Sequence, residues 1–187
     1  MKCMDVILSR QSVRSFSDEP VPEEIIDQIL EAGRWAPSTQ NRQPWRFIVI
    51  KDREIIRKLA VNSGFIGLVN HFIRDAAFVI VACAEPKEDM VLNGQPYYLV
   101  DTAIALQQMV LAAWSFGIGS CWLGAFSETS VKAFLDIPDS IRVIAITPFG
   151  YPKDRKSLYS KAVSSFAGSR KRRPKEDIFY INKWRKK

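Results

Sequence analysis

The sequence predicts one α/β or α+β domain in which helices cover a central sheet in three layers. Helix-periodic segments alternate with strand-like apolar runs along the chain, with no internal repeat and no clean domain boundary. The length of 187 residues suits a single domain. A hydrophobic content of 47% and an aromatic content of 11% are enough for a core and argue against disorder.

In the first third of the chain, apolar residues predict a short helix over 1–9 and a longer helix over 22–35. Pro22 suits the first position of the longer helix, and the two glutamates that follow favour its positive end. A strand is expected over 46–51, and Asp52 is expected to cap the helix after it.

The strongest signals lie in the middle of the chain. A continuous apolar run over 77–84 has the length of a strand and suits the centre of a sheet. The helix expected over 97–116 carries a broad apolar stripe, which predicts that it is covered on several sides. Gly117 and Gly119 are expected to end this helix.

Shorter segments complete the predicted body of the protein. A strand is expected over 120–123, and a helix that begins with a serine cap is expected over 127–135. A further strand is expected over 142–149, where Pro148 and Gly150 are expected to break it.

The cysteines and the lengths of the apolar runs exclude several classes of protein. The three cysteines are odd in number and form no CxxC pair, so neither a disulfide framework nor a zinc site is indicated. Cys83 and Cys121 lie in apolar strand-like runs and are expected to be buried thiols. No apolar run reaches the length of a membrane span, and the N-terminus has no cleavage-type signal. We therefore expect a cytoplasmic protein with no membrane partner.

The net charge of +7 is concentrated near the C-terminus. Residues 151–187 contain 13 Lys or Arg and 3 Asp or Glu. Residues 1–150 contain 14 Lys or Arg and 17 Asp or Glu. Four successive cations occupy 170–173, and a last short strand is expected over 178–181. Such a basic segment can face solvent, bind nucleic acid or a membrane surface, or clamp a phosphate group.

Three residues near the N-terminus form a candidate grip for a phosphate. In an extended chain Arg10, Ser12 and Arg14 point to one side and present two guanidinium groups around a hydroxyl. Arginine stays charged and donates two parallel hydrogen bonds, which suits phosphate and sugar oxygens. The alternative is a solvated turn in which the arginines hold no ligand.

A polar loop closed by a Pro-Trp pair spans residues 37–45. Its neutral side chains can hydrogen-bond the edge of a heteroaromatic ring without adding charge, and the prolines stiffen its ends. The alternative is a connector whose side chains cap the neighbouring helix and strand. The polar residues of the loop that carry the first interpretation are Ser38, Thr39, Asn41 and Gln43.

Glycines within 117–124 allow the backbone to approach a flat ligand closely, although Gly117 by itself is better explained as the end of a helix. His71 is the only histidine and is expected to be structural. The sequence contains no evident metal-ligand cluster and no acid–base pair, which fits an enzyme whose cofactor carries the chemistry.

Five stretches of the chain, in order, resemble the nitroreductase family in its short form: RQSVRSFSDEPVP, APSTQNRQPWRFIVI, DTAIALQQMVLAAWSFGIGSCWLGAF, FGYP and RRPKEDIFY. The resemblance implies an α+β domain over 1–187 with a mixed, mostly antiparallel sheet in three α/β/α layers. It also implies a homodimer with flavin sites at the interface, and a basic arm, 153–187, that is swapped onto the partner subunit.

The cofactor implied by the resemblance is FMN, with NADH or NADPH as the electron donor. The matching positions hold the phosphate and ribityl chain, line the ring from the other subunit, or run beside the ring. Arg14 is also the candidate for stabilising negative charge near the ring. The cofactor-binding residues that the resemblance implies are Arg10, Ser12, Arg14, Pro37, Ser38, Thr39, Asn41, Gln43, Leu123, Gly124, Ala125, Arg170 and Arg172.

The activity implied is electron transfer from NAD(P)H through flavin N5 to a nitroaromatic, a quinone or a similar small acceptor, in a ping-pong cycle. Two alternatives stay open. One is an FMN-dependent ene reductase or dehalogenase of the same fold, and the other is a non-catalytic flavin- or nucleic-acid-binding protein. The acidic body and the lack of aromatics between the tail cations argue against a nucleic-acid partner.

Overall fold

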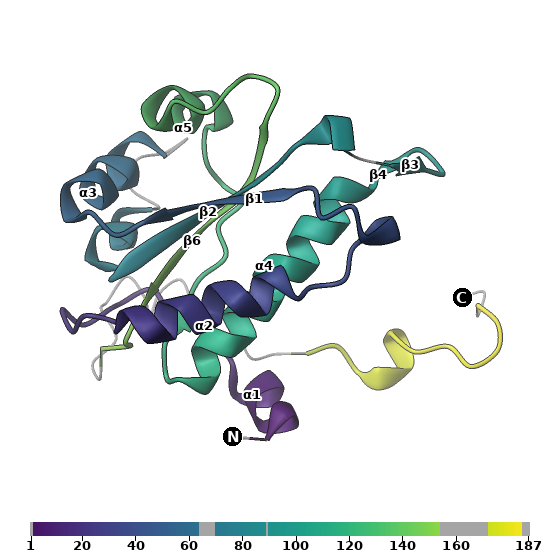
Figure 1. The fold of residues 1–187 in the computed structure, drawn as a ribbon. Helices are drawn as coiled ribbons and strands as arrows, with labels where there is room; N and C mark the ends of the chain where they lie inside the picture. Colours follow the sequence, from purple (N-terminus) through teal and green to yellow (C-terminus); the bar gives the residue numbers. More distant parts are fainter. Residues whose placement is uncertain (1, 64–69, 89, 154–171, 185–187) are drawn as a thin grey trace.

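The computed structural model describes residues 2–63, 70–88, 90–153 and 172–184 (Figure 1). Its helices are α1 Cys3–Ser9, α2 Glu23–Arg34, α3 Arg53–Asn62, α4 Tyr97–Ser115 and α5 Glu128–Leu135. Its strands are β1 Trp45–Ile50, β2 Phe78–Ala84, β3 Val91–Leu92, β4 Gln95–Pro96, β5 Gly119–Ser120 and β6 Arg142–Gly150. These elements agree closely with the segments that the sequence predicts between residues 1 and 150.

The central sheet is antiparallel, with its four strands in the order β1-β2-β6-β5. In its register Ile50 lies opposite Val79, and Phe78 lies opposite Phe149. A parallel bridge between Ser12 and Ser120 brings the N-terminal segment alongside β5. The prediction of an α+β fold with a mostly antiparallel sheet is therefore confirmed.

Two separate apolar cores lie on opposite faces of the sheet. All seven residues of β2 are buried, and they alternate between the two faces. Val79 and Val81 pack into a core shared with α3 and α5, whereas Ile80 packs into a core shared with α2 and α4. Figure 1 shows these two helix pairs on either side of the strands. The predicted three layers are thus observed.

Both predicted helix caps are present. The Asp52 carboxylate accepts hydrogen bonds from the Glu54 and Ile55 amides at 2.8 and 3.0 Å. The Ser127 hydroxyl accepts one from the Ser130 amide at 3.3 Å. Each cap satisfies amides that a helix leaves without a partner in its own first turn, so these serine and aspartate positions fix where α3 and α5 begin.

The expected break at Pro148 is wrong, because β6 continues without interruption from Arg142 to Gly150. Toward β5, the described pairings of β6 involve Ile146, Phe149 and Gly150. None of these pairings requires an amide at Pro148, so the missing proline N–H costs the sheet no hydrogen bond there.

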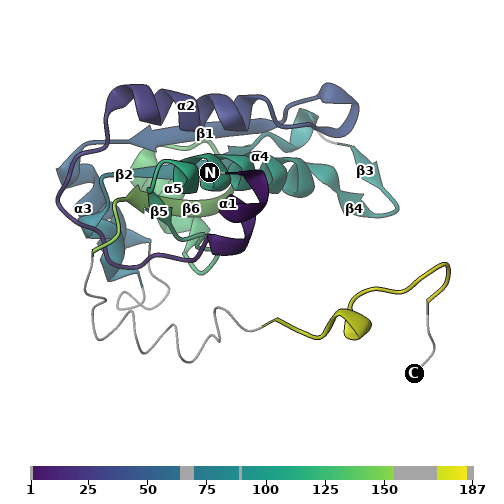
Figure 2. The same ribbon diagram turned by 90° about the horizontal axis from the view of Figure 1, so that it is seen from below.

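The expected strand over 178–181 is also wrong for the single chain. These residues follow a 3₁₀ turn at Lys175–Asp177 and pair with no strand that the structure describes. Figures 1 and 2 both show residues 172–184 outside the layered body. Their large apolar side chains are mostly exposed: Ile178 49%, Phe179 68%, Ile181 85% and Trp184 78%. A strand needs a neighbouring edge, and this segment reaches none among the described strands.

The long helix α4 buries one side and exposes another. It ends before Gly117, whose φ of 78° lies in the left-handed region that glycine adopts without strain. Leu99, Val100 and Ile104 are 40%, 43% and 38% exposed. The predicted cover on several sides is therefore not found within one chain. An apolar helix face left open in this way is typical of a surface that another chain covers.

Candidate cofactor-binding site

The N-terminal grip runs beside β5. The Val13 amide donates to the Ser120 carbonyl at 2.9 Å, and Ser12 bridges the same residue. A Cβ atom on Gly119 would lie 2.5 Å from a Val13 methyl carbon, so this close approach requires the glycine. The contact holds the segment between Arg10 and Arg14 against the sheet.

The two arginines and the serine of the grip all influence the pKa of one buried thiol. Burial raises the pKa of Cys121, while the positive charge of Arg14, a hydrogen bond with Ser12 and the charge of Arg10 act in the opposite direction. The Nη1 atom of Arg14 is buried and has no hydrogen-bond partner among the described residues.

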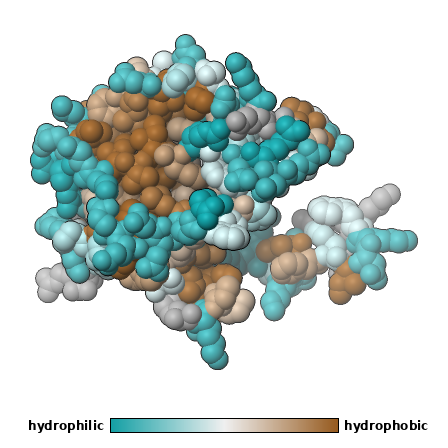
Figure 3. All heavy atoms as spheres, viewed as in Figure 1, coloured by the Kyte–Doolittle hydropathy of each residue, from teal (hydrophilic) through white to brown (hydrophobic). Residues whose placement is uncertain are grey.

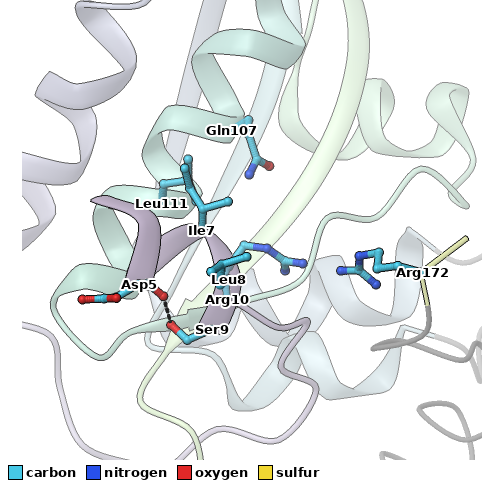
Figure 4. A pocket seen from close by; sticks show the side chains of 8 residues that line it. All are labelled: Asp5, Ile7, Leu8, Ser9, Arg10, Gln107, Leu111 and Arg172. Carbon is cyan, nitrogen blue, oxygen red and sulfur yellow. Dashed lines mark hydrogen bonds between the residues drawn. The ribbon is translucent and has the colours of Figure 1, made fainter. Parts of the chain in front are cut away.

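A hollow of about 940 Å³ opens between α1, α4 and the start of the C-terminal segment. In Figure 4 the guanidinium groups of Arg10 and Arg172 point toward one another across it. Two cations that face each other favour an anion between them, and phosphate suits their geometry. The predicted partner Arg170 lies outside the described residues. The residues that line the hollow are Asp5, Ile7, Leu8, Ser9, Arg10, Gln107, Leu111 and Arg172.

Two residues that the sequence did not single out fix the position of Arg10. The Trp114 indole donates to the Ser9 hydroxyl at 2.8 Å, and that hydroxyl donates to the Asp5 carbonyl at 2.5 Å. Because Ser9 ends α1 directly before Arg10, this contact anchors the grip to α4. No sequence signal links Ser9 with Trp114, since they lie 105 positions apart.

The polar loop has an unusual backbone. Gln40, Asn41 and Gln43 have φ values of 51°, 57° and 50°, in the left-handed region that such residues rarely adopt. The Ser38 hydroxyl accepts from the Gln43 amide at 3.0 Å, and the Gln43 side chain donates to the Asn41 carbonyl and side-chain oxygens at 3.1 Å. Strained backbone of this kind is concentrated at functional sites.

Thr39 connects the loop to α4. Its amide lies 3.1 Å from both carboxylate oxygens of Asp101, and its hydroxyl donates to the Oδ1 atom at 3.2 Å. Asp101 is only 3% exposed. The sequence analysis missed this residue, because the loop alone contains no signal for a partner 62 positions away.

The third predicted segment, Leu123 to Ala125, lies along the edge of β6. Leu123 exchanges backbone hydrogen bonds with Ile146 at 3.0 and 3.1 Å. The Ala125 carbonyl accepts from the Asn70 side chain at 3.0 Å. Gly124, between them, is exposed and has no atom within 4 Å of the point where a Cβ would stand. This leaves an open stretch of backbone that a flat ligand can approach.

One chain does not bring the loop and the grip together. The loop is tied to Asp101 near the start of α4, and the grip is tied to Trp114 near its end. These two residues are 13 positions apart, which corresponds to about 20 Å along a helix. Within one chain the loop and the grip therefore lie at opposite ends of α4, and we call them the two candidate half-sites.

Phe72 has a structural role: it is 7% exposed and packs in the core, with its ring centroid 6.4 Å from that of Phe16. Within the described ranges no helix is long and apolar enough to cross a membrane. The same residues contain no group of three His, Cys, Asp or Glu side chains that could hold a metal ion.

Comparison with known proteins places the chain in a family. The Nitroreductase family matches residues 7–62 and 67–151. A proposed NADH dehydrogenase/NAD(P)H nitroreductase of Archaeoglobus fulgidus is 39% identical over 164 residues, which cover 84% of this chain and 90% of that protein. An FMN reductase (NAD(P)H) of Bacillus subtilis is 30% identical over 166 residues, which cover 80% of this chain and 65% of that protein.

Solved structures agree with the sequence comparison. The crystal structure of a nitroreductase family protein from Clostridium novyi NT has a TM-score of 0.78 at 35% identity, with 82% of this chain and 87% of that chain covered. The chain therefore belongs to the Nitroreductase family and is an NAD(P)H nitroreductase/FMN reductase family enzyme.

Proposed function

We propose that the protein binds FMN at a site shared by two copies of the chain, and passes electrons from NAD(P)H to a nitroaromatic, a quinone or a similar small acceptor in a ping-pong cycle. The observation that carries this proposal is the buried Nη1 of Arg14, which has no partner among the described residues. A buried cationic N–H without a partner is costly, so the position favours an anionic ligand.

The residues present fit FMN. Arg10 and Arg172 would hold its phosphate, and Ser12 would donate to the ribityl chain. The loop at 37–43 and the open backbone at 123–125 would position the ring. FMN, when bound, supplies the chemistry: it accepts a hydride and passes the electrons on. The chain contributes alignment of the reactants and a fixed electrostatic environment, in which Arg14 would stabilise negative charge near the ring.

The two half-sites support a homodimer. A loop and a grip at opposite ends of one helix can face each other when a second copy, related by a two-fold axis, packs along α4. The exposed apolar residues of α4, Leu99, Val100 and Ile104, lie on that helix. Packing there would bring the loop of one copy to the grip of the other.

The open edge of the sheet supports the swapped arm. Among the described strands β1 pairs with β2 alone, so its outer edge is free to accept another strand. Figure 3, in the view of Figure 1, shows apolar surface gathered over β1 between the two helix layers. The segment Ile178 to Ile181, apolar and exposed, suits addition to this edge in the partner.

Anaerobic absorption spectra of the purified protein test the proposed function. We expect a flavin spectrum that bleaches on addition of NADH or NADPH and recovers on addition of a nitroaromatic or a quinone. A flavin that neither nicotinamide bleaches would contradict the proposed donor. Recovery with an enone or a halogenated aromatic, but with no nitroaromatic or quinone, would favour the alternative reactions. A protein that neither contains nor takes up FMN would overturn the proposal.

A further inference from the structure

We infer that Asp101 is the positioning residue that locks the loop at 37–43 into the conformation in which it meets the flavin ring of the other copy. The inference rests on the proposed function for the identity of the ligand. The contact itself rests on the structure alone. The hydrogen bonds that the described residues make to the Asp101 carboxylate come from Thr39, so Asp101 acts through that residue.

Both oxygens of the Asp101 carboxylate accept hydrogen bonds from Thr39. The Asp101 carboxylate receives the Thr39 amide on both oxygens and the Thr39 hydroxyl on one of them, at 3.1 to 3.2 Å. Asp101 is 3% exposed, and a carboxylate removed from water needs such donors. Each partner thus stabilises the other, and loss of either would leave a buried polar group without its hydrogen bonds.

The loop needs an external anchor. Three of its non-glycine residues have a positive φ, and such backbone persists only where its surroundings hold it. The hydrogen bonds of Ser38, Asn41 and Gln43 tie the loop to itself. The bonds from Thr39 to Asp101 tie its middle to the rigid helix α4. Asp101 therefore selects one loop conformation out of several that the loop's own bonds would allow.

The same contact decides which loop groups face a ligand. Both donors of Thr39 are taken up by Asp101, so Thr39 itself is not left to meet the ring, whereas its neighbour Ser38 is. The Ser38 hydroxyl accepts from the Gln43 amide, which leaves its proton to donate. In this arrangement Thr39 orients the loop, and its neighbours contact the flavin.

Asp101 also sets the spacing between the half-sites. It holds the loop at one end of α4, while Trp114 on the same helix holds Ser9 and the grip at the other end. Because a helix is stiff over this distance, the two half-sites keep a fixed separation. In a two-fold dimer the same separation would apply at both flavin sites.

The test compares Asp101→Asn with Thr102→Val. Thr102 is the next residue of α4, is fully buried, and has a hydroxyl without a hydrogen-bond partner among the described residues, so its replacement leaves the loop contact intact. In the FMN-free protein, we expect Asp101→Asn to speed hydrogen exchange at the Thr39 amide by about tenfold. With FMN, we expect its Kd to rise about tenfold and the visible spectrum of the bound flavin to shift. Thr102→Val is expected to leave the exchange rate of the Thr39 amide and the Kd for FMN within about twofold of the wild type, and the flavin spectrum unshifted.

A second pair of variants covers the case in which Asp101→Asn fails to fold. Thr39→Val removes the hydroxyl donor and is expected to act in the same direction with a smaller effect, whereas Thr39→Ser keeps both donors and is expected to match the wild type. Unchanged exchange at Thr39 in Asp101→Asn, or equal effects of Thr39→Val and Thr39→Ser, would overturn the inference. A wild-type protein without affinity for FMN would refute the proposed function instead, and the exchange measurement would still decide the role of Asp101.

Discussion

The arginine side chains are the residues on which cofactor retention should depend. Arg10→Ala and Arg172→Ala each remove one of the two guanidinium groups that face each other across the hollow. A charge-assisted hydrogen bond contributes about 1.5–3 kcal/mol, so each change is expected to raise the Kd for FMN by at least about tenfold. Titration of the FMN-free protein, followed by flavin fluorescence, measures this.

A matched control for those variants is Arg34→Ala. Arg34 is exposed on α2, where it pairs with Glu31 at 2.6 Å and stacks over Trp35. Its removal takes away the same charge at a distance from the hollow and is expected to leave FMN affinity unchanged. Wild-type affinity in both Arg10→Ala and Arg172→Ala would rule out the phosphate assignment.

The three cysteines should differ sharply in reactivity. Burial raises the pKa of Cys83 to about 11 and also raises that of Cys121, whereas Cys3 is exposed. The thiolate is the reactive form, so at pH 8 the two buried thiols are both protonated and shielded. We expect a disulfide reagent to modify Cys3 rapidly and the other two only on unfolding. Rapid modification of all three in the folded protein would contradict the described packing.

At the scale of elements, Glu128 joins the start of α5 to the start of β6. Its carboxylate accepts from the Arg142 side chain and from the Val143 amide, both at 2.9 Å. Burial opposes its ionisation, but these hydrogen bonds and the charges of Arg142 and Lys132 outweigh burial and lower the pKa of Glu128 below its ordinary 4.5. A lowered pKa means that the charged form stabilises the fold above pH 4.5, and that this contribution is lost as the pH falls below that value.

Glu128→Gln is therefore expected to lower the free energy of unfolding by about 1 kcal/mol at pH 7. The difference from the wild type should shrink as the pH falls below 4.5, which urea unfolding at several pH values would measure. Glu54→Gln serves as the control, because Glu54 and Arg57 form an exposed pair that is expected to contribute little. A difference that is constant from pH 7 to pH 3 would show that the carboxylate charge is not responsible.

Element by element, the sequence predicted what depends on near neighbours in the chain. Asp52 and Ser127 cap helices through bonds to residues two or three positions away, so local patterns were sufficient. Pro148 was expected to break β6 because proline lacks an amide hydrogen. Whether a strand tolerates a proline depends on which of its residues pair with the neighbouring strands, and that is not visible in the local sequence. Thr39 and Asp101 meet across 62 positions, and a single sequence carries no record of such a contact.

For the whole molecule, the shared site predicts that dimerisation and FMN binding are lost together. Removal of residues 172–187 would delete both the segment proposed to cross to the partner and Arg172. We expect this truncated protein to sediment as a monomer without FMN. The full-length variant Arg172→Ala is the control: it is expected to remain a dimer and to lose only FMN affinity. A folded, FMN-bound monomer at micromolar concentration would contradict the shared-site arrangement.

The two failures of prediction at this scale have one physical cause. The segment over 178–181 has the composition of a strand, and α4 has the composition of a helix that is covered on several sides. Neither finds its neighbour in one chain. Sequence patterns report what a segment buries without reporting which chain buries it, so the pattern alone could not say whether these two segments are covered within one chain.

The order of strands in the sheet also determines when the sheet can form during translation. The fully apolar strand β2 is complete at residue 84, but its inner neighbour β6 does not end until residue 150. At ~5–20 residues per second, the nascent chain waits several seconds with one side of β2 unpaired. The centre of this domain thus cannot form vectorially behind the exit tunnel, and the nascent polypeptide is exposed to misassociation until almost the entire body has been translated.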